Sequence, residues 1–91
     1  MADVLPATVI GFECLRIDSA ILMEIGGGET PILPPDKAIK YAGLAASRIA
    51  DFVLGTDYGI LDYLEAADFL EKDYERLARA IRFVVDSLRV P

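Results

Sequence analysis

The first 25 residues carry a pattern of apolar positions that is typical of β-strands. Two segments rich in β-branched and aromatic residues, 8–17 (TVIGFECLRI) and 20–25 (AILMEI), flank the turn-forming pair Asp18-Ser19. They predict a β-hairpin over residues 7–25. A two-residue turn would place Ile10, Phe12, Cys14, Ile21, Met23 and Ile25 on one face, and Leu15, Ile17 and Leu22 on the other. Because both faces are apolar and both edges are open, we expect this hairpin to pair with another chain in a continuous sheet.

A Gly/Pro loop over residues 26–35 separates the hairpin from a helical pattern. Between residues 36 and 54, apolar and small residues recur at spacings of three and four, and Gly55 is placed as a C-terminal stop. This spacing predicts a first helix. Its inner stripe would consist of Ile39, Ala42, Ala46, Ile49 and Val53.

The rest of the chain follows a seven-residue pattern over four heptads. Thr56 is a plausible N-cap, and the pattern predicts one long helix that ends near Leu88. Its seam alternates between two sets, Ile60, Ala67, Tyr74, Ile81 and Leu88, and Tyr63, Leu70, Leu77 and Val84. If this long helix packs antiparallel to the first helix, it would extend beyond the end of the first helix by about 20 Å. The expected fold is therefore one α+β domain over residues 1–91, with a hairpin at 7–25, a loop at 26–35 and a helical hairpin at 36–89.

The chain has more large apolar residues than a core of this size is expected to bury, and the additional ones are candidates for an interface. Phe69 and Phe83 stand fourteen residues apart, off the seam, with Arg76 midway between them, and they are residue types that are enriched at interface centres. An intramolecular core is the alternative for these two rings. The overhang and the hairpin add the candidates Ile81, Val85, Leu88, Ile21 and Met23.

The amino-acid composition excludes several classes of function, and no motif indicates a particular one. The net charge of −6 opposes binding to a phosphate backbone, and the absence of His, Asn and Gln excludes histidine-dependent triads and amide oxyanion holes. The missing amides also fit a thermophilic source. The lone Cys14, in apolar surroundings, is expected to be a buried structural thiol. Without an apolar block of membrane length or a secretory signal, we expect a soluble, cytoplasmic protein that binds no membrane.

Two patterns resemble sites only weakly. Gly26, Gly27, Gly28 and Thr30 could present backbone N–H groups to a phosphate, but the Walker spacing is absent, and a flexible connector is the preferred interpretation. In the two-residue-turn register, Glu13 and Glu24 face each other and could share a proton or a cation, or could simply be solvated or paired with arginine. Asp62, Glu65 and Asp68 are expected to form a solvated face. No catalytic residue, metal site or cofactor is assigned.

These observations favour a non-enzymatic assembly subunit that forms a homo-oligomer, a dimer in the simplest case, or joins another protein. The alternative is a regulatory domain that binds a small ligand in a pocket at the glycine-rich loop. A carboxylate-dependent enzyme that uses Glu13 and Glu24 is a third class, without an identified nucleophile.

Overall fold

A computed structural model describes residues 5–28 and 32–89 and contains four α-helices. They are α1 (Pro6–Ile25), α2 (Pro35–Leu54), α3 (Ile60–Leu70) and α4 (Glu75–Arg89). No strand occurs in the described ranges. The expected α+β fold is therefore wrong, and the fold class is all-α.

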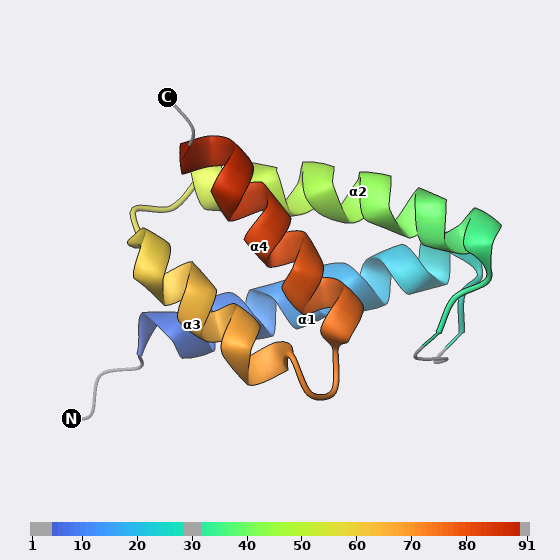
Figure 1. Ribbon diagram of the computed structural model, residues 1–91, viewed down its shortest axis with the longest axis horizontal. Helices are drawn as coiled ribbons and strands as arrows, with labels where there is room; N and C mark the ends of the chain where they lie inside the picture. Colours follow the sequence, from blue (N-terminus) through green and yellow to red (C-terminus); the bar gives the residue numbers. More distant parts are fainter. Residues whose placement is uncertain (1–4, 29–31, 90–91) are drawn as a thin grey trace.

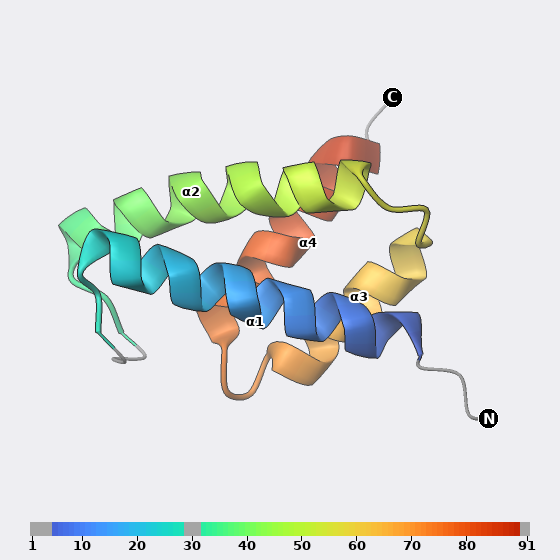
Figure 2. The same ribbon diagram turned by 180° about the vertical axis from the view of Figure 1, so that it is seen from behind.

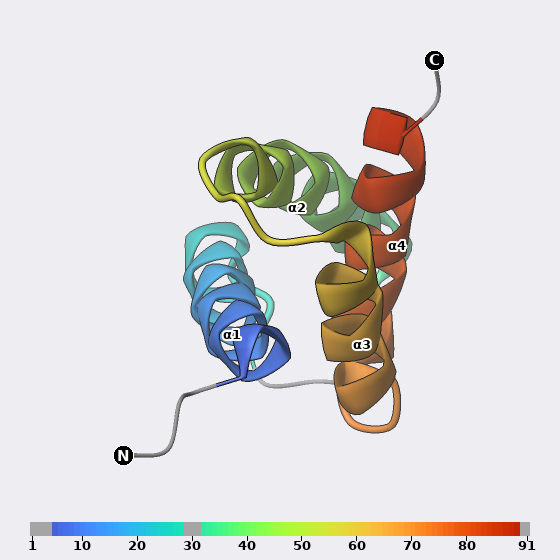
Figure 3. The same ribbon diagram turned by 90° about the vertical axis from the view of Figure 1, so that its left-hand side faces the viewer.

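The helices form two hairpins that pack against each other (Figure 1). α1 and α2 form one layer, and α3 and α4 form the other, as the side view in Figure 3 shows. α1 packs against α2 and α3, and α4 completes the ring through its contacts with α2 and α3. The centre is filled by the largest fully buried side chains: Ile10, Ile21, Ile49, Leu77, Ile81 and Cys14.

α1 occupies the segment that the sequence pattern assigned to a β-hairpin. Pro6 stands in the first turn, where its missing N–H is harmless, and Gly26 ends the helix with φ +70°, in the left-handed region. The N–H of Gly27 bonds to the carbonyl of Leu22 at 2.9 Å, which completes a Schellman-type stop. Asp18 and Ser19, the expected turn, lie inside this helix. The predicted intermolecular sheet is wrong for the same reason.

α2 agrees closely with the predicted first helix and ends before Gly55, as expected. Its buried side differs from the predicted stripe. Tyr41, Ala45 and Ile49 are buried, whereas Ile39 and Ala42 are exposed. α2 is thus rotated, and part of its apolar surface lies outside the core.

The predicted long helix over residues 56–88 is wrong, because the chain turns at residues 71–74 and folds into α3 and α4. Folding back buries much of the heptad seam between the two helices, with Tyr63, Leu70, Leu77 and Ile81 all buried. Arg82 of α4 reinforces the turn by bonding to Asp68 and Glu71 near the end of α3. The turn contains neither Gly nor Pro, so the sequence offers no strong breaker at this point.

Thr56, the expected N-cap of the second helix, lies in the connection before α3 instead. Its hydroxyl bonds to the carbonyl of Val53 and to the hydroxyl of Tyr63. The N-cap of α3 is Gly59, whose N–H donates to the carboxylate of Asp62 at 3.1 Å. This contact satisfies one of the backbone donors at the helix start.

Candidate functional site

The outward side of α1 carries an apolar stripe directly opposite its buried side. Val9, Phe12 and Met23 of α1 are exposed, as is Leu5, the extended residue just before the helix, while Ile10, Cys14, Ile17 and Ile21 face the core. The positions 5, 9, 12, 16, 19 and 23 follow one another at alternating spacings of four and three, which is the repeat of a two-helix seam. In Figure 2, α1 lies at the front of the molecule along its whole length. A helix that is apolar on both sides is typical of one that is covered on both sides.

Two polar residues, Arg16 and Ser19, interrupt this outer stripe in its middle. Arg16 donates hydrogen bonds to the carboxylate of Glu13 within the same helix. The bonded guanidinium lowers the pKa of the Glu13 carboxyl, and the carboxylate raises the pKa of Arg16. The stripe therefore has apolar ends and one ion pair near its centre.

The buried side of α1 contains one charged residue, Asp18, which is only 3% exposed. The hydroxyl of Tyr41 donates to Asp18 Oδ1 at 2.5 Å, and Arg76 Nε donates to the same oxygen at 3.3 Å. The Arg76 guanidinium carbon also lies 5.3 Å from the centre of the Tyr41 ring. Burial, together with the Asp18 carboxylate, raises the pKa of Tyr41. This cluster joins α1, α2 and α4 through a satisfied buried charge.

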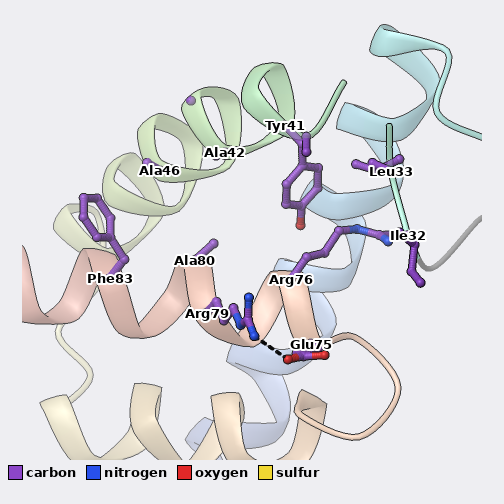
Figure 4. Close-up of a pocket in the computed structure, with 12 residues that line it drawn as sticks. Ile32, Leu33, Tyr41, Ala42, Ala46, Glu75, Arg76, Arg79, Ala80 and Phe83 are labelled. Atoms are coloured by element: carbon purple, nitrogen blue, oxygen red, sulfur yellow. Dashed lines mark hydrogen bonds and ion pairs between the residues drawn. The ribbon is translucent and has the colours of Figure 1, made fainter. Parts of the chain in front are cut away.

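A groove with a volume of about 670 Å³ runs between α2 and α4. Its walls are mostly small or apolar, and Figure 4 shows Tyr41, Ala42 and Ala46 on one side with Ala80 and Phe83 on the other. Leu33 and Ile32, which follow the glycine-rich loop, close one end. The volume falls within the usual range for small-molecule sites.

The polar groups of this groove gather at one end. Glu75, Arg76 and Arg79 lie near the Ile32–Leu33 end, and Phe83 lies at the opposite end (Figure 4). Arg79 Nη2 donates to Glu75 Oε1 at 2.7 Å, and the side chains of both residues are largely exposed. Arg76 reaches back to the buried Asp18. The groove thus has an arginine-bearing end and an apolar end.

The interface candidates from the sequence divide into buried and exposed groups. Ile21, Ile81 and Val85 lie in the core of the chain itself, and Arg76 is held by Asp18. Phe69 of α3 and Phe83 of α4 are 65% and 63% exposed but lie on different helices, and only Phe83 lines the groove. Met23 and Leu88 are also exposed. Of this set, only Met23 belongs to the outer stripe of α1.

Among the described residues, the glycines of the loop have structural roles. Gly26 ends α1, and its carbonyl accepts a 2.7 Å hydrogen bond from Lys37 Nζ of α2. A Cβ atom on Gly27 would lie 3.1 Å from side-chain atoms of Leu22 and Leu33, so the chain passes close to both. Gly28 has φ +65°. Thr30, the fourth residue of the expected phosphate loop, lies outside the described residues.

The expected pairing of Glu13 with Glu24 depends on the hairpin and does not occur. Eleven residues separate them on α1, about 16 Å along the helix axis. Glu13 bonds to Arg16, and Glu24 Oε2 bonds to Arg48 Nη2 of α2 at 2.5 Å. Within the described ranges, no cluster of three or more His, Cys, Asp or Glu residues could hold a metal ion. The expected solvated face of α3 holds in part, since Glu65 and Asp68 are exposed and Asp62 is half-buried.

Cys14 is buried at the centre of α1, as its apolar surroundings predicted. Burial raises the pKa of its thiol to about 12. No helix of the described segments has both the length and the apolarity that crossing a membrane requires.

Comparisons with known proteins add no assignment. No protein family, curated protein or solved structure matches this chain. The features of the chain that bear on function are the outer stripe of α1, the buried Asp18 cluster and the α2–α4 groove.

Sequence reasoning missed the two residues that characterise α1 best, Phe12 and Asp18. Signals for both were present. Pro6 and Gly26 bracket the segment as helix boundaries, and helical spacing then separates Phe12 from the inner residues. The same spacing places Asp18 on the inner side, where a carboxylate requires partners.

Proposed function

We propose that the protein is a non-enzymatic assembly subunit in which α1 pairs with α1 of a second copy. The observation that supports this proposal is the exposed stripe formed by Leu5, Val9, Phe12 and Met23, opposite a fully packed inner face. A second helix laid on this stripe removes four large apolar side chains from water, which favours association.

The polar residues of the stripe select the direction of the pairing. In a parallel pair, each Arg16 meets the partner's Arg16 across the seam, and like charges repel. An antiparallel pair centred on residue 14 instead places Phe12 opposite the partner's Arg16, Val9 opposite the partner's Ser19 and Leu5 opposite the partner's Met23. Arg16 then lies against an aromatic ring and beside the partner's Glu13.

The size of the contact indicates the strength of the pairing. α1 is about 30 Å long and about 10 Å wide, so its stripe alone is smaller than a standard interface of about 800 Å² per partner. The dimer is therefore expected to dissociate in the micromolar range, unlike an obligate dimer with a large apolar interface. This property suits a subunit that exchanges partners within a larger assembly.

Sedimentation velocity over a range of concentrations tests the proposal with two matched variants. Phe12→Asp and Phe69→Asp each place a carboxylate at an exposed ring, 70% exposed on α1 and 65% exposed on α3. We expect the wild type and Phe69→Asp to dimerise at tens of micromolar and Phe12→Asp to remain a monomer with unchanged helical circular dichroism.

Two results would count against the proposal. A monomeric wild type at several hundred micromolar removes self-assembly as the function. A dimer that is unaffected by Phe12→Asp places the interface on a surface other than the outer stripe of α1.

A further inference from the structure

The α2–α4 groove differs from the stripe on α1 because it is concave and has one polar end. The stretch of α2 that lines it runs from residue 38 to 46, and the stretch of α4 runs from 75 to 83. Each stretch is about 12 Å long. A groove of this length and of about 670 Å³ suits one small molecule and is too short for a standard protein interface.

The charges of the molecule are divided unequally between its helices. α2 and α4 together carry seven of the nine basic residues and four of the fifteen acids, a net charge of +3. The remainder of the chain carries two basic residues and eleven acids, a net charge of −9. The two helices that form the groove therefore carry an excess of basic residues, of which Arg48, Arg76 and Arg82 are paired with acids of α1 and of the α3 end. Arg79 is an exposed cation that lines the groove.

The lining of the groove contains more basic than acidic side chains. Two arginines and one glutamate line its polar end, whereas Asp18, the partner of Arg76, is buried and does not line it. The Arg79 side chain is 75% exposed, and its planar guanidinium has five N–H donors, enough to serve Glu75 and a second acceptor. An anionic head group placed there would make charge-assisted hydrogen bonds.

We propose that the α2–α4 groove binds a small amphiphilic monoanion, a carboxylate with an unbranched apolar body of about ten carbons. The head group is held by Arg79, and the apolar body lies along Ala42, Ala46 and Ala80 toward Phe83. The small side chains of the floor leave room for the apolar body, and Phe83, which is 63% exposed, covers its end. Ligand binding between α2 and α4 is separate from the proposed self-assembly, which uses α1.

Isothermal titration calorimetry with decanoate, decanol and decyltrimethylammonium, each below its micelle concentration, tests the charge preference. Decanoate should bind at least about tenfold more tightly than the neutral and cationic probes, because only its head group bonds to Arg79. Equal affinities for the three probes would overturn the proposal, since they would indicate an unspecific apolar surface.

Variants within and outside the groove test the location. Arg79→Gln should weaken decanoate binding about tenfold and leave decanol unchanged, and Glu75→Gln should strengthen decanoate binding by releasing Arg79. Ala42→Phe, at an exposed position, should weaken both probes by filling the groove. Arg89→Gln, which removes a cation of α4 outside the groove, should change neither. If Ala42→Phe and Arg79→Gln bind decanoate like the wild type, the site lies elsewhere and the proposal is wrong.

The Phe12→Asp variant separates this proposal from the proposed function. Decanoate should bind to it as it binds to the wild type, because the groove does not involve α1. Loss of decanoate binding in Phe12→Asp would place the ligand on the α1 stripe and overturn the groove assignment. Sedimentation of the same samples reports on self-assembly independently of the ligand.

Discussion

α1 and α4 are both packed along one side and differ in what their other side carries. α4 buries Leu77, Ile81 and Val84 and exposes Arg79, Asp86 and Arg89, so its outward surface is largely charged apart from Phe83 and Leu88. α1 buries an equally regular stripe, but its opposite side carries the apolar stripe that contains Phe12 and Met23. A helix with one apolar and one charged side can bury its apolar side within its own chain and leave the charged side in water. The proposed self-association therefore uses α1, whose outward side carries large apolar residues, rather than α4.

The largest expected contrast is between the buried Cys14 of α1 and an exposed cysteine on α2 in their reaction with a thiol reagent. Cys14 lies on the inner side with a pKa of about 12, so its thiolate fraction near pH 8 is about a thousandfold below that of an ordinary thiol. We expect iodoacetamide to modify Cys14 about a thousandfold more slowly than a cysteine introduced by Ser47→Cys at an exposed position of α2, as mass spectrometry would measure.

The same raised pKa predicts how stability depends on pH. The fold favours the neutral thiol, so this contribution to stability is fully present below the ordinary pKa of 9.0 and is lost as the pH rises toward 12.

For the alkylation experiment, comparable rates for Cys14 and the introduced cysteine in the folded protein would mean that the inner side of α1 opens readily, and the expected contrast would fail.

The next effect is the cost of breaking the buried charge cluster. Arg76→Ala removes the guanidinium that bonds to the buried Asp18 carboxylate, and we expect the free energy of unfolding to fall by about 3 kcal/mol. Arg89→Ala, which removes an exposed ion pair with Asp86 on the same helix, should cost less than about 0.5 kcal/mol. Urea denaturation measures both. Similar losses for the two variants would show that the cluster contributes no more than a surface pair.

The direction of the α1 pairing can be read from cross-linking. A mixture of Leu5→Cys and Met23→Cys proteins should yield a covalent dimer with a short bismaleimide, because the antiparallel register brings these two positions together. Each variant alone should yield little. Cys14 does not interfere, since it is buried and its thiol remains protonated. Efficient linking of Leu5→Cys to itself would indicate a parallel pair and would contradict the assigned register.

The smallest effects test whether α1 is a helix with a glycine stop. Gly11 lies inside α1 with no atom near the site of an added Cβ, so Gly11→Ala should raise stability by about 0.5 to 1 kcal/mol. Gly26 has φ +70°, and Gly26→Ala should lower stability by about 1 kcal/mol. Thermal or urea unfolding checks both signs. A destabilising Gly11→Ala would argue against helical structure at residue 11.

The sequence by itself determined the features that depend on local chemistry. α2 matches its predicted bounds closely because helical spacing, the proline residues before it and Gly55 after it agree with one another. The buried state of Cys14 and the apolar character of both sides of the first 25 residues were also readable. Tyr63, Leu70, Leu77 and Ile81 of the predicted heptad seam are buried, although in two helices rather than one.

Only the tertiary structure decided how these patterns are used. In residues 8–25 eleven of the eighteen positions are apolar, and their spacing fits the period of a strand as well as that of a helix. Packing against α2 and α3 selects the helix. The turn at residues 71–74 has no breaker of its own and forms because folding back gives the seam a partner. The Asp18 cluster and the α2–α4 groove follow from these two choices, because both bring together residues from helices far apart in the chain.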